Sequence, residues 1–497
     1  MVGRLDQFLS GHDLPKLFYS FFSQLSFDQF FPYSCTIGFS CSPAPLDFQN
    51  QVVQRQPSAR LLQQIIHMGQ IHKSPAVRHP LNLIGFPRPL KGFQSGQILM
   101  GIVVIVDAFF GNPAGRLLCI DKAGHADGFS LKSEGAIVYN AGRGTIMPGF
   151  IDCHAHLCGE ENAGFFAGGK FFGDQLLGSA YQCGLLLDAG FTGIRDMSEN
   201  GLYLSRAIDR GILRGPRILP GGKILGITSG HIDLSPYMTK EAFNQSDHLC
   251  RLTDGPDDCI QAVREQFRAG AGFIKICATG GVSSPVDRMD DVQFSPEEMK
   301  AIVDETKRHH SYVCAHCSGY EGAYAALQAG VACIEHGVYL TQREIDLMKE
   351  KDATLVTTLT VSLGVADMPG LPDYQAKKAR FCAEANIKTI EMARKAGIRI
   401  ALGTDFSNSP NTPYLENGRE FEAMTRAGMT NMEAIKAGTI NAAHLLMRSH
   451  ETGSLEQGKL ADIVIADGNP LEDINCLTCA DHIRLVMLGG EIKKAIN

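Results

Sequence analysis

Between residues 147 and 445, eight short apolar runs alternate with longer segments in which apolar residues recur every three or four positions. This alternation is typical of parallel βα units, in which each strand is followed by a helix that covers the sheet. Eight such units close into a barrel. We therefore predict an α/β fold, a (β/α)8 TIM-type barrel over residues 147–445. The runs are 150–152, 190–195, 217–219, 273–277, 312–315, 332–335, 354–358 and 398–402.

Several segments between the runs carry signals for the start of a helix. Ser295 is followed by Pro296 and then by Glu298, which is a capping box with proline in the first turn. Two later threonine–glutamate pairs repeat the capping pattern: Thr341 with Glu344, and Thr430 with Glu433. We expect these helices to be structural, with one apolar face buried against the barrel.

The segments on either side of the predicted barrel are rich in strand signals. Apolar runs at 102–106 and 117–120 are separated by glycine and Asn-Pro, and the run 483–488 leads into Gly489-Gly490, a hairpin signal. The simplest packing joins both ends of the chain. We predict one small β-sandwich domain built from residues 96–146 and 446–497.

Residues 1–95 show no sustained period of 2 or 3.6 and are rich in Phe, Gln, Ser and Pro. We assign them no fold; a poorly ordered extension or a segment unrelated to the domain is favoured over a partner-binding arm. The apolar stretch from Leu17 to Phe31 is interrupted by Ser, Gln and Asp28, so it lacks the continuous core of a signal peptide or membrane span. We expect a cytoplasmic protein.

The composition argues against two classes of partner. A net charge of −7, with 20% charged residues, gives no basic field for nucleic acid or an anionic membrane, so we expect a small-molecule partner. The 15 cysteines are scattered, several within apolar runs, which favours a reducing compartment over a disulfide scaffold. Cys476 and Cys479 lack a second cysteine pair, and we assign them no role.

The first apolar run of the predicted barrel ends in His154-Ala155-His156. Side chains two apart on a strand point to the same face, so both imidazoles can hold one cation. Zinc and its neighbours suit imidazole ligands. Later runs end in further candidate ligands, which are Lys275, His316, His336 and Asp405. Because the carboxyl ends of barrel strands meet at one rim, these six residues predict a metal site.

Lys275 lies within the apolar run 271–277, where an isolated ammonium would be costly to desolvate. A neutral lysine amine can react with carbon dioxide to give a carbamate, an anionic ligand able to bridge two cations. The alternative is an ordinary buried lysine paired with a nearby acid. The four histidines favour the carbamate, so we predict Lys275 as a bridging ligand.

The segment 147–156 resembles the first-strand motif of the amidohydrolase superfamily. Later strand ends extend this resemblance in the right order, so that it covers the chain from about residue 140 to the C-terminus: 192–196, 273–282, 315–316, 334–337 and 402–405. Three further segments, 228–231, 278–282 and 293–298, resemble one subgroup more narrowly. This subgroup contains prolidase-like Xaa-Pro dipeptidases and ochratoxinase-like N-acyl amino acid hydrolases.

The resemblance implies two divalent metal ions, most simply Zn²⁺. His154, His156, Lys275 and Asp405 would hold one ion, and Lys275, His316 and His336 the other, with a hydroxide between them as nucleophile. Asp405 would take the proton of the nucleophile and pass it to the leaving amine. The implied reaction is hydrolysis of the amide bond of a dipeptide or N-acyl amino acid by a homo-oligomeric enzyme.

Two further residues bear on the predicted substrate site. His231 resembles a loop histidine that donates a hydrogen bond to the substrate or the developing oxyanion, although it could instead only shape a glycine turn. Ser318 stands where several relatives carry a histidine or another large polar residue, which concerns the substrate pocket and not the metals. Arg288 and Tyr339 could also reach the pocket, but a solvated charge and a packing aromatic are the favoured interpretations.

Two alternative functions stay open on the same fold. The His-x-His start also suits a mononuclear deaminase or a cyclic-amide hydrolase of the imidazolonepropionase type, but such relatives usually lack the bridging lysine. A non-catalytic scaffold is the second alternative, because a fold does not determine a function. The complete ligand set opposes it.

Overall fold

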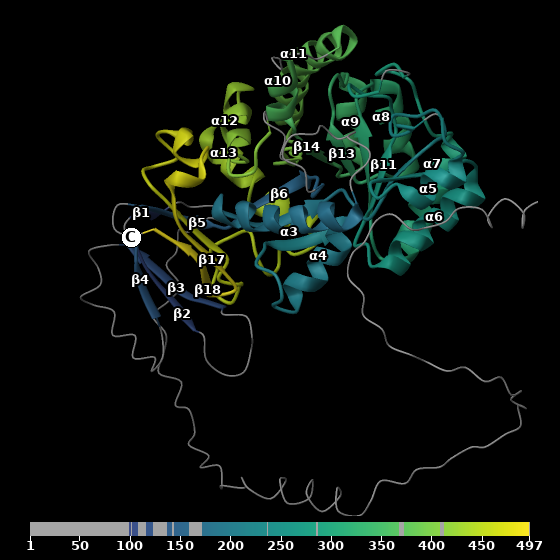
Figure 1. Cartoon of the computed structure of the whole chain (residues 1–497). Helices are drawn as coiled ribbons and strands as arrows, with labels where there is room; N and C mark the ends of the chain where they lie inside the picture. Colours follow the sequence, from purple (N-terminus) through teal and green to yellow (C-terminus); the bar gives the residue numbers. More distant parts are fainter. Residues whose placement is uncertain are drawn as a thin grey trace, which may run out of the picture. The chain divides into compact units, whose positions relative to one another are not determined.

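The computed structural model describes residues 99–100, 102–107, 116–122, 137–141, 144–158, 171–235, 237–284, 287–366, 372–407 and 412–496 (Figure 1). The segment 1–95, to which no fold was assigned from the sequence, lies outside these residues. The statements below concern the described part of the chain.

The strands expected from the eight apolar runs are present and parallel to their neighbours. They form two groups in sheet order, β6-β7-β8 and β11-β12-β13-β14-β15. Their bounds are β6 (Phe150–Ala155), β7 (Phe191–Asp196), β8 (Arg217–Pro220), β11 (Ile274–Cys277), β12 (Val313–Cys317), β13 (Cys333–His336), β14 (Thr354–Val356) and β15 (Ile400–Ala401). The prediction of an α/β fold with a parallel sheet is confirmed.

Backbone hydrogen bonds also join the outer strands of these two groups. On one side, the Cys153 N–H of β6 donates to Leu402 O beyond β15 at 2.9 Å. On the other side, the Gly272 N–H before β11 donates to Pro220 O of β8 at 2.8 Å. With contacts at both margins, the strand order is that of a (β/α)8 barrel.

Two short strands were missed in the sequence. β9 (Ile224–Gly226) and β10 (Cys250–Leu252) pair in parallel, and β9 also pairs with β11 through Leu225 and Ile276. At three residues each, they are too short to show a period. They bracket the loop that carries His231, so they help to position that loop beside the strand ends.

The helices alternate with the barrel strands, as expected (Figure 1). All three predicted capping boxes are present, at α7, α9 and α13. Each places an acceptor on the free N–H groups of a first turn. The helices are α3 (Phe172–Asp188), α4 (Asn200–Asp209), α5 (Lys240–Ser246), α6 (Pro256–Ala269), α7 (Pro296–Arg308), α8 (Tyr320–Ala329), α9 (Gln342–Glu350), α10 (Leu359–Ala366), α11 (Asp373–Ala396), α12 (Arg419–Arg426), α13 (Asn431–Ala437) and α14 (Ile440–Leu445).

Strands from before and after the barrel share one sheet, with the order β1-β5-β16-β17-β18. In it, β5 pairs antiparallel with β16, and β17 and β18 form a hairpin through Gly489 and Gly490, both with positive φ. A second sheet has the order β3-β2-β4. The bounds are β1 (Leu99–Met100), β2 (Ile102–Asp107), β3 (Arg116–Lys122), β4 (Ile137–Asn140), β5 (Thr145–Pro148), β16 (Ile463–Ala466), β17 (Ile483–Leu488) and β18 (Glu491–Ala495). A separate sandwich domain with the stated boundaries remains a prediction.

The four strands β6, β11, β12 and β13 are buried along their length, including the positions that carry polar side chains. Most of the buried apolar residues form one cluster that includes Phe150, Ile274 and Phe421. Such a core holds the strand ends rigidly, which suits a site assembled from several strands. Of the helices in the described ranges, none is both long and apolar enough to cross a membrane.

Candidate metal centre and active site

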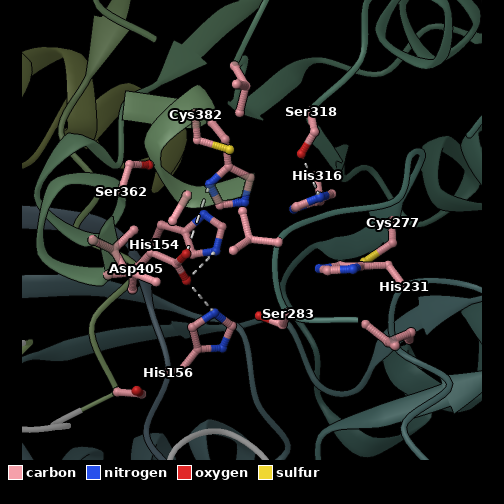
Figure 2. Close-up of a pocket in the computed structure, with 18 of the residues that line it drawn as sticks. His154, His156, His231, Cys277, Ser283, His316, Ser318, Ser362, Cys382 and Asp405 are labelled. Carbon is pink, nitrogen blue, oxygen red and sulfur yellow. Dashed lines mark hydrogen bonds and ion pairs between the residues drawn. The ribbon is translucent and has the colours of Figure 1, made fainter. Parts of the chain in front are cut away.

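The six predicted ligands line one cavity of about 350 Å³, and His231 lines it with them (Figure 2). Five strands, or the loops that follow them, carry the six ligands: His154 on β6 and His156 directly after it, Lys275 on β11, His316 on β12, His336 on β13 and Asp405 in the loop after β15. Because parallel strands end at the same rim, residues more than 250 positions apart in the chain meet in one place.

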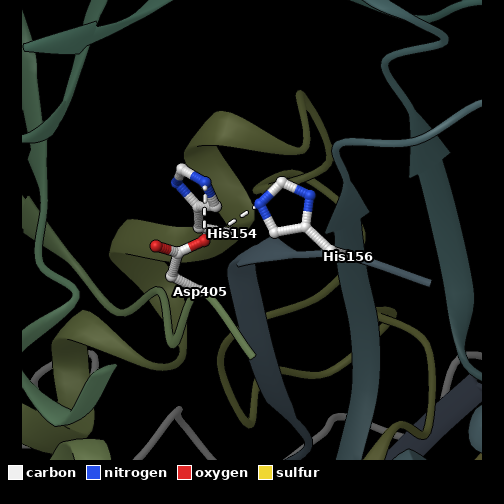
Figure 3. A group of neighbouring side chains, drawn as sticks. All are labelled: His154, His156 and Asp405. Atoms are coloured by element: carbon white, nitrogen blue, oxygen red, sulfur yellow. Dashed lines mark ion pairs between the residues drawn. The ribbon is translucent and has the colours of Figure 1, made fainter. Parts of the chain in front are cut away.

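His154, His156 and Asp405 form the tightest group (Figure 3). Asp405 Oδ1 lies 2.9 Å from His156 Nε2 and 3.4 Å from His154 Nε2. The ligand atoms of the three residues lie within 4.8 Å of one another. Two imidazoles and a carboxylate at this spacing can bind a divalent cation.

The histidine rings continue from this group as an arc around the cavity (Figure 2). Ring centroids are 5.2 Å apart for His156 and His154, 4.9 Å for His154 and His336, and 4.5 Å for His336 and His316. His231 then stacks on His316, with centroids 4.6 Å apart. The arc therefore places His156 and His154 of one predicted ligand set beside His336 and His316 of the other.

In each of three histidines, one ring nitrogen is within hydrogen-bonding distance of a protein oxygen. His154 Nδ1 lies 2.7 Å from Glu335 Oε2, and His336 Nδ1 lies 2.7 Å from Thr358 Oγ1. His316 uses its other nitrogen, since Nε2 lies 3.2 Å from Gly280 O. Each ring therefore keeps its second nitrogen for a ligand, which is how metal-binding histidines are usually oriented. The residues fit a metal centre.

Burial lowers the pKa of His154, His316 and His336 well below the usual value for histidine. Neighbouring imidazoles and Lys275 add to this effect. The three rings are therefore neutral near pH 7, and neutral imidazole is the form that binds a metal.

Lys275 is only 2% exposed, and its Nζ lies 3.5 Å from His154 Nε2. It is therefore in contact with the group of His154, His156 and Asp405, and it lines the same cavity as His316 and His336. Its role as a ligand shared by two cations and its carboxylation remain predictions.

Two of the predicted ligands have an unusual backbone. His336 and Asp405 have φ angles of 65° and 58°, in the left-handed region that side-chain-bearing residues seldom adopt. Such a conformation costs of order 1–3 kcal/mol and persists where the surrounding structure imposes it, often at functional sites. Both residues lie where a strand gives way to a loop, so this geometry turns their side chains toward the cavity.

Sequence reasoning missed the residues that orient the ligands. Glu335 is fully buried beside His154, and its other oxygen accepts from Arg195 Nη2 at 2.5 Å. Asp152 accepts hydrogen bonds from the His154 and Thr404 N–H groups and from the Thr404 hydroxyl. Asp152 and Glu335 both lie within apolar runs of the predicted barrel. A charged residue inside such a run was the signal that could have identified them.

His231 reaches the cavity from the loop after β9. Its Nδ1 lies 3.1 Å from Asp287 Oδ2, and its own N–H donates to Gln293 Oε1. Ser318 also lines the cavity, with Oγ 3.3 Å from His316 Nε2. As expected, Arg288 is an exposed loop charge paired with Asp290, and Tyr339 packs against Tyr320 and Phe381.

Part of the cavity lining is apolar. It comes from the β13 loop and from α10 and α11, whose contributions include Val338, Val361, Val365, Ala379 and Cys382. Ser283 and Ser362 add small polar side chains to the lining (Figure 2). An apolar cavity with a few polar groups and a metal site on one side is the usual form of a small-molecule pocket.

Comparison with known proteins gives the family. The model of the amidohydrolase family matches residues 145–493, which is most of the chain. The chain belongs to the amidohydrolase family. The match begins just before the His-x-His strand and includes every predicted ligand, so the resemblance predicted from the motifs is confirmed.

Within the amidohydrolase family, the relatives fall in the subgroup that the motifs indicated. Ochratoxinase from Aspergillus niger is 34% identical over 376 residues, covering 70% of this chain and 75% of that protein. The structure of a prolidase complexed with N-methylphosphonate-L-proline has a TM-score of 0.71 at 30% identity and covers 79% of this chain and 94% of its own. A Xaa-Pro dipeptidase with bound methionine has a TM-score of 0.67 at 28% identity, with 79% and 94% covered.

Family membership gives the class of reaction. This amidohydrolase is a hydrolase that acts on carbon–nitrogen bonds. Its cavity, lined by the candidate ligands and by apolar side chains, is a site for a small molecule.

Proposed function

We propose that this protein hydrolyses the amide bond of a dipeptide or an N-acyl amino acid with the help of two divalent cations, most simply zinc. The observation that carries the proposal is the convergence of four histidines, Lys275 and Asp405 on one cavity. The names of its relatives, an ochratoxinase and enzymes that cleave Xaa-Pro dipeptides, support an amide next to a carboxylate-bearing amine.

His154, His156, Asp405 and a carboxylated Lys275 would hold one cation, and Lys275, His316 and His336 the other. Such cations supply Lewis acidity toward the scissile carbonyl and lower the pKa of a water molecule to near neutrality. Glu335 and Thr358 keep His154 and His336 oriented for this task by engaging one nitrogen of each ring.

Asp405 would move the proton. Its Oδ1 faces His154 and His156, while Oδ2 lies 4.0 Å from His336 Nδ1, toward the rest of the arc. The carboxylate would take a proton from the attacking water and deliver it to the amine nitrogen as the carbon–nitrogen bond breaks. One group then serves as base and as acid, and the enzyme returns to its starting state.

His231 would contact the substrate from the side opposite to Asp405. With Nδ1 engaged by Asp287, Nε2 would donate to the scissile carbonyl oxygen or to the substrate carboxylate when both ring nitrogens carry a proton. The apolar wall from α10 and α11 would take a hydrophobic acyl or side-chain group. A cavity of about 350 Å³ is in the range of sites for small ligands.

A single-metal reaction is the second candidate, and one observation favours it. The group with ligand atoms within 4.8 Å consists of His154, His156 and Asp405, which could hold one cation without Lys275. The protein would then function as a deaminase or a cyclic-amide hydrolase. Counting bound metal in active protein separates the two candidates.

The proposed reaction is tested by a substrate screen. Protein reconstituted with zinc, cobalt or manganese is incubated with libraries of N-acyl amino acids and Xaa-Pro dipeptides, and the released amine is quantified. We expect turnover of at least one class, abolished by chelation and by Asp405→Asn. Folded, metal-loaded protein that releases no amine from any member of these libraries would contradict the proposal.

A further inference from the structure

The loop after β11 is held against the cavity by a lysine from a distant helix. Lys378 lies on α11, and its Nζ donates to Gly281 O at 2.9 Å, Ser284 O at 2.9 Å and Asp287 O at 2.8 Å. The carboxylate of Asp287 adds a fourth acceptor at 3.3 Å. An ammonium has three protons, so its donors are fully used by this loop.

Asp287 links this lysine to His231. Its side chain is 2% exposed and accepts from the Gly281 N–H at 3.1 Å as well as meeting His231 Nδ1 at 3.1 Å. Burial would raise the pKa of Asp287, but the hydrogen bond from His231 and the charge of Lys378 hold it below its usual value. The Asp287 carboxylate is therefore an anion, and it accepts a hydrogen bond from the protonated Nδ1 of His231.

The ring of His231 has little room to turn. One face stacks on His316, with an interplanar angle of 21°. The backbone at Gly281 approaches its edge so closely that a Cβ there would lie 2.4 Å from His231 Cε1 and 2.5 Å from Nε2. Because Lys378 and Asp287 both bond to Gly281, a shift of this loop would move the surface against which the ring rests.

We propose that Lys378 is a positioning residue that acts through Asp287 on His231. The same helix contributes Gln375, Ala379 and Cys382 to the cavity wall, so α11 fixes the pocket and the His231 loop together. Its part in turnover rests on the proposed function, in which Nε2 of His231 faces the substrate. Lys378 itself touches no reacting atom and holds the geometry in which Nε2 is presented.

The chain provides a matched control for the test. Lys377 precedes Lys378 on α11 and is exposed, so Lys377→Met makes the same charge change on the same helix. Lys378→Met should raise amide hydrogen exchange in residues 280–291 relative to Lys377→Met and the parent protein. Hydrogen exchange requires no substrate, so it tests whether Lys378 holds the loop after β11 even if the proposed function fails. Unchanged exchange in that segment would overturn the proposal.

A double-mutant cycle tests the link to His231 in the active enzyme. Asparagine can keep a donor near Asp287 while it removes Nε2, so His231→Asn deletes the substrate-facing nitrogen. We expect Lys378→Met to lower kcat by about 10- to 100-fold with KM changed by less than about threefold, because misplacement of a catalytic-site group costs this much. In the His231→Asn background, the same change should cost less than about twofold. Additive losses would overturn the proposal.

Discussion

His154 Nδ1 lies 2.7 Å from Glu335 Oε2, and both side chains are buried. The two residues are 181 positions apart and belong to β6 and β13. Glu335 is held in turn by Arg195, whose guanidinium also donates from Nε to Cys153 O at 2.6 Å. The hydrogen bond fixes His154 with Nε2 toward the cavity, so the geometry of the metal centre depends on a buried ion pair behind it.

Replacing Glu335 by glutamine should weaken metal binding more than it weakens the fold. The amide keeps the shape of the carboxylate but lowers the basicity that it lends to His154, and such changes typically cost about 10- to 100-fold in metal affinity. Competition with a coloured chelator would measure the affinity of Glu335→Gln. Glu305→Gln, which alters a buried acid paired with Arg264 on the helix side, is the control. Equal affinities of the two variants would refute the orienting role.

Glu420 should make stability depend on pH. It caps the start of α10, accepting from the Leu359 N–H at 3.0 Å and the Thr360 N–H at 2.8 Å. Burial raises its pKa from 4.5 to about 7. The folded state therefore binds this proton more tightly, so the contribution to stability is full below pH 4.5 and is lost as pH rises to about 7.

The shift in the pKa of Glu420 corresponds to a loss of about 3 kcal/mol in the free energy of unfolding between pH 4 and pH 8. Glu420→Gln should remove this part of the pH dependence of stability. Urea denaturation of both proteins across this range measures it. The parent protein should lose stability relative to Glu420→Gln as pH rises. If the difference between the two proteins stayed constant with pH, the carboxylate would not be titrating as its burial requires.

The apolar wall should decide which acyl groups fit. Val365 lies on α10 and lines the cavity, so Val365→Phe would fill part of its space. We expect kcat/KM for bulky acyl groups to fall by about tenfold or more, with a smaller change for acetyl substrates. The ratio of the two values in the variant and the parent reports selectivity independently of the active fraction. A uniform loss for both substrates would point to a distorted site instead.

The barrel and the convergence of the candidate ligands on one cavity could be predicted because their signals are local. His154, Lys275 and His336 each end or interrupt an apolar run, and the parallel topology then brings such ends together without any knowledge of packing. The capping box at Ser295 is likewise complete within four residues. Strand ends and helix starts are determined by neighbours in the sequence.

The supporting contacts depend on packing between distant segments. The sequence around Glu335 indicates a strand end but does not reveal that its acid faces His154 of β6. Lys378 is one of several charges on α11, and a charge on a helix usually faces solvent; only the tertiary structure places it under the β11 loop. The left-handed backbone at Asp405 could not be predicted, because this conformation is usually indicated by a glycine and the residue is an aspartate. These features required the structure.

The central claim is a pair of cations bridged by Lys275, and metal stoichiometry of active protein tests it most directly. Protein loaded with zinc in bicarbonate buffer and then freed of loose metal should contain about two equivalents per chain, while Lys275→Ala should keep about one and lose at least about 100-fold in kcat. One equivalent in fully active parent protein, or full activity in Lys275→Ala, would contradict the account.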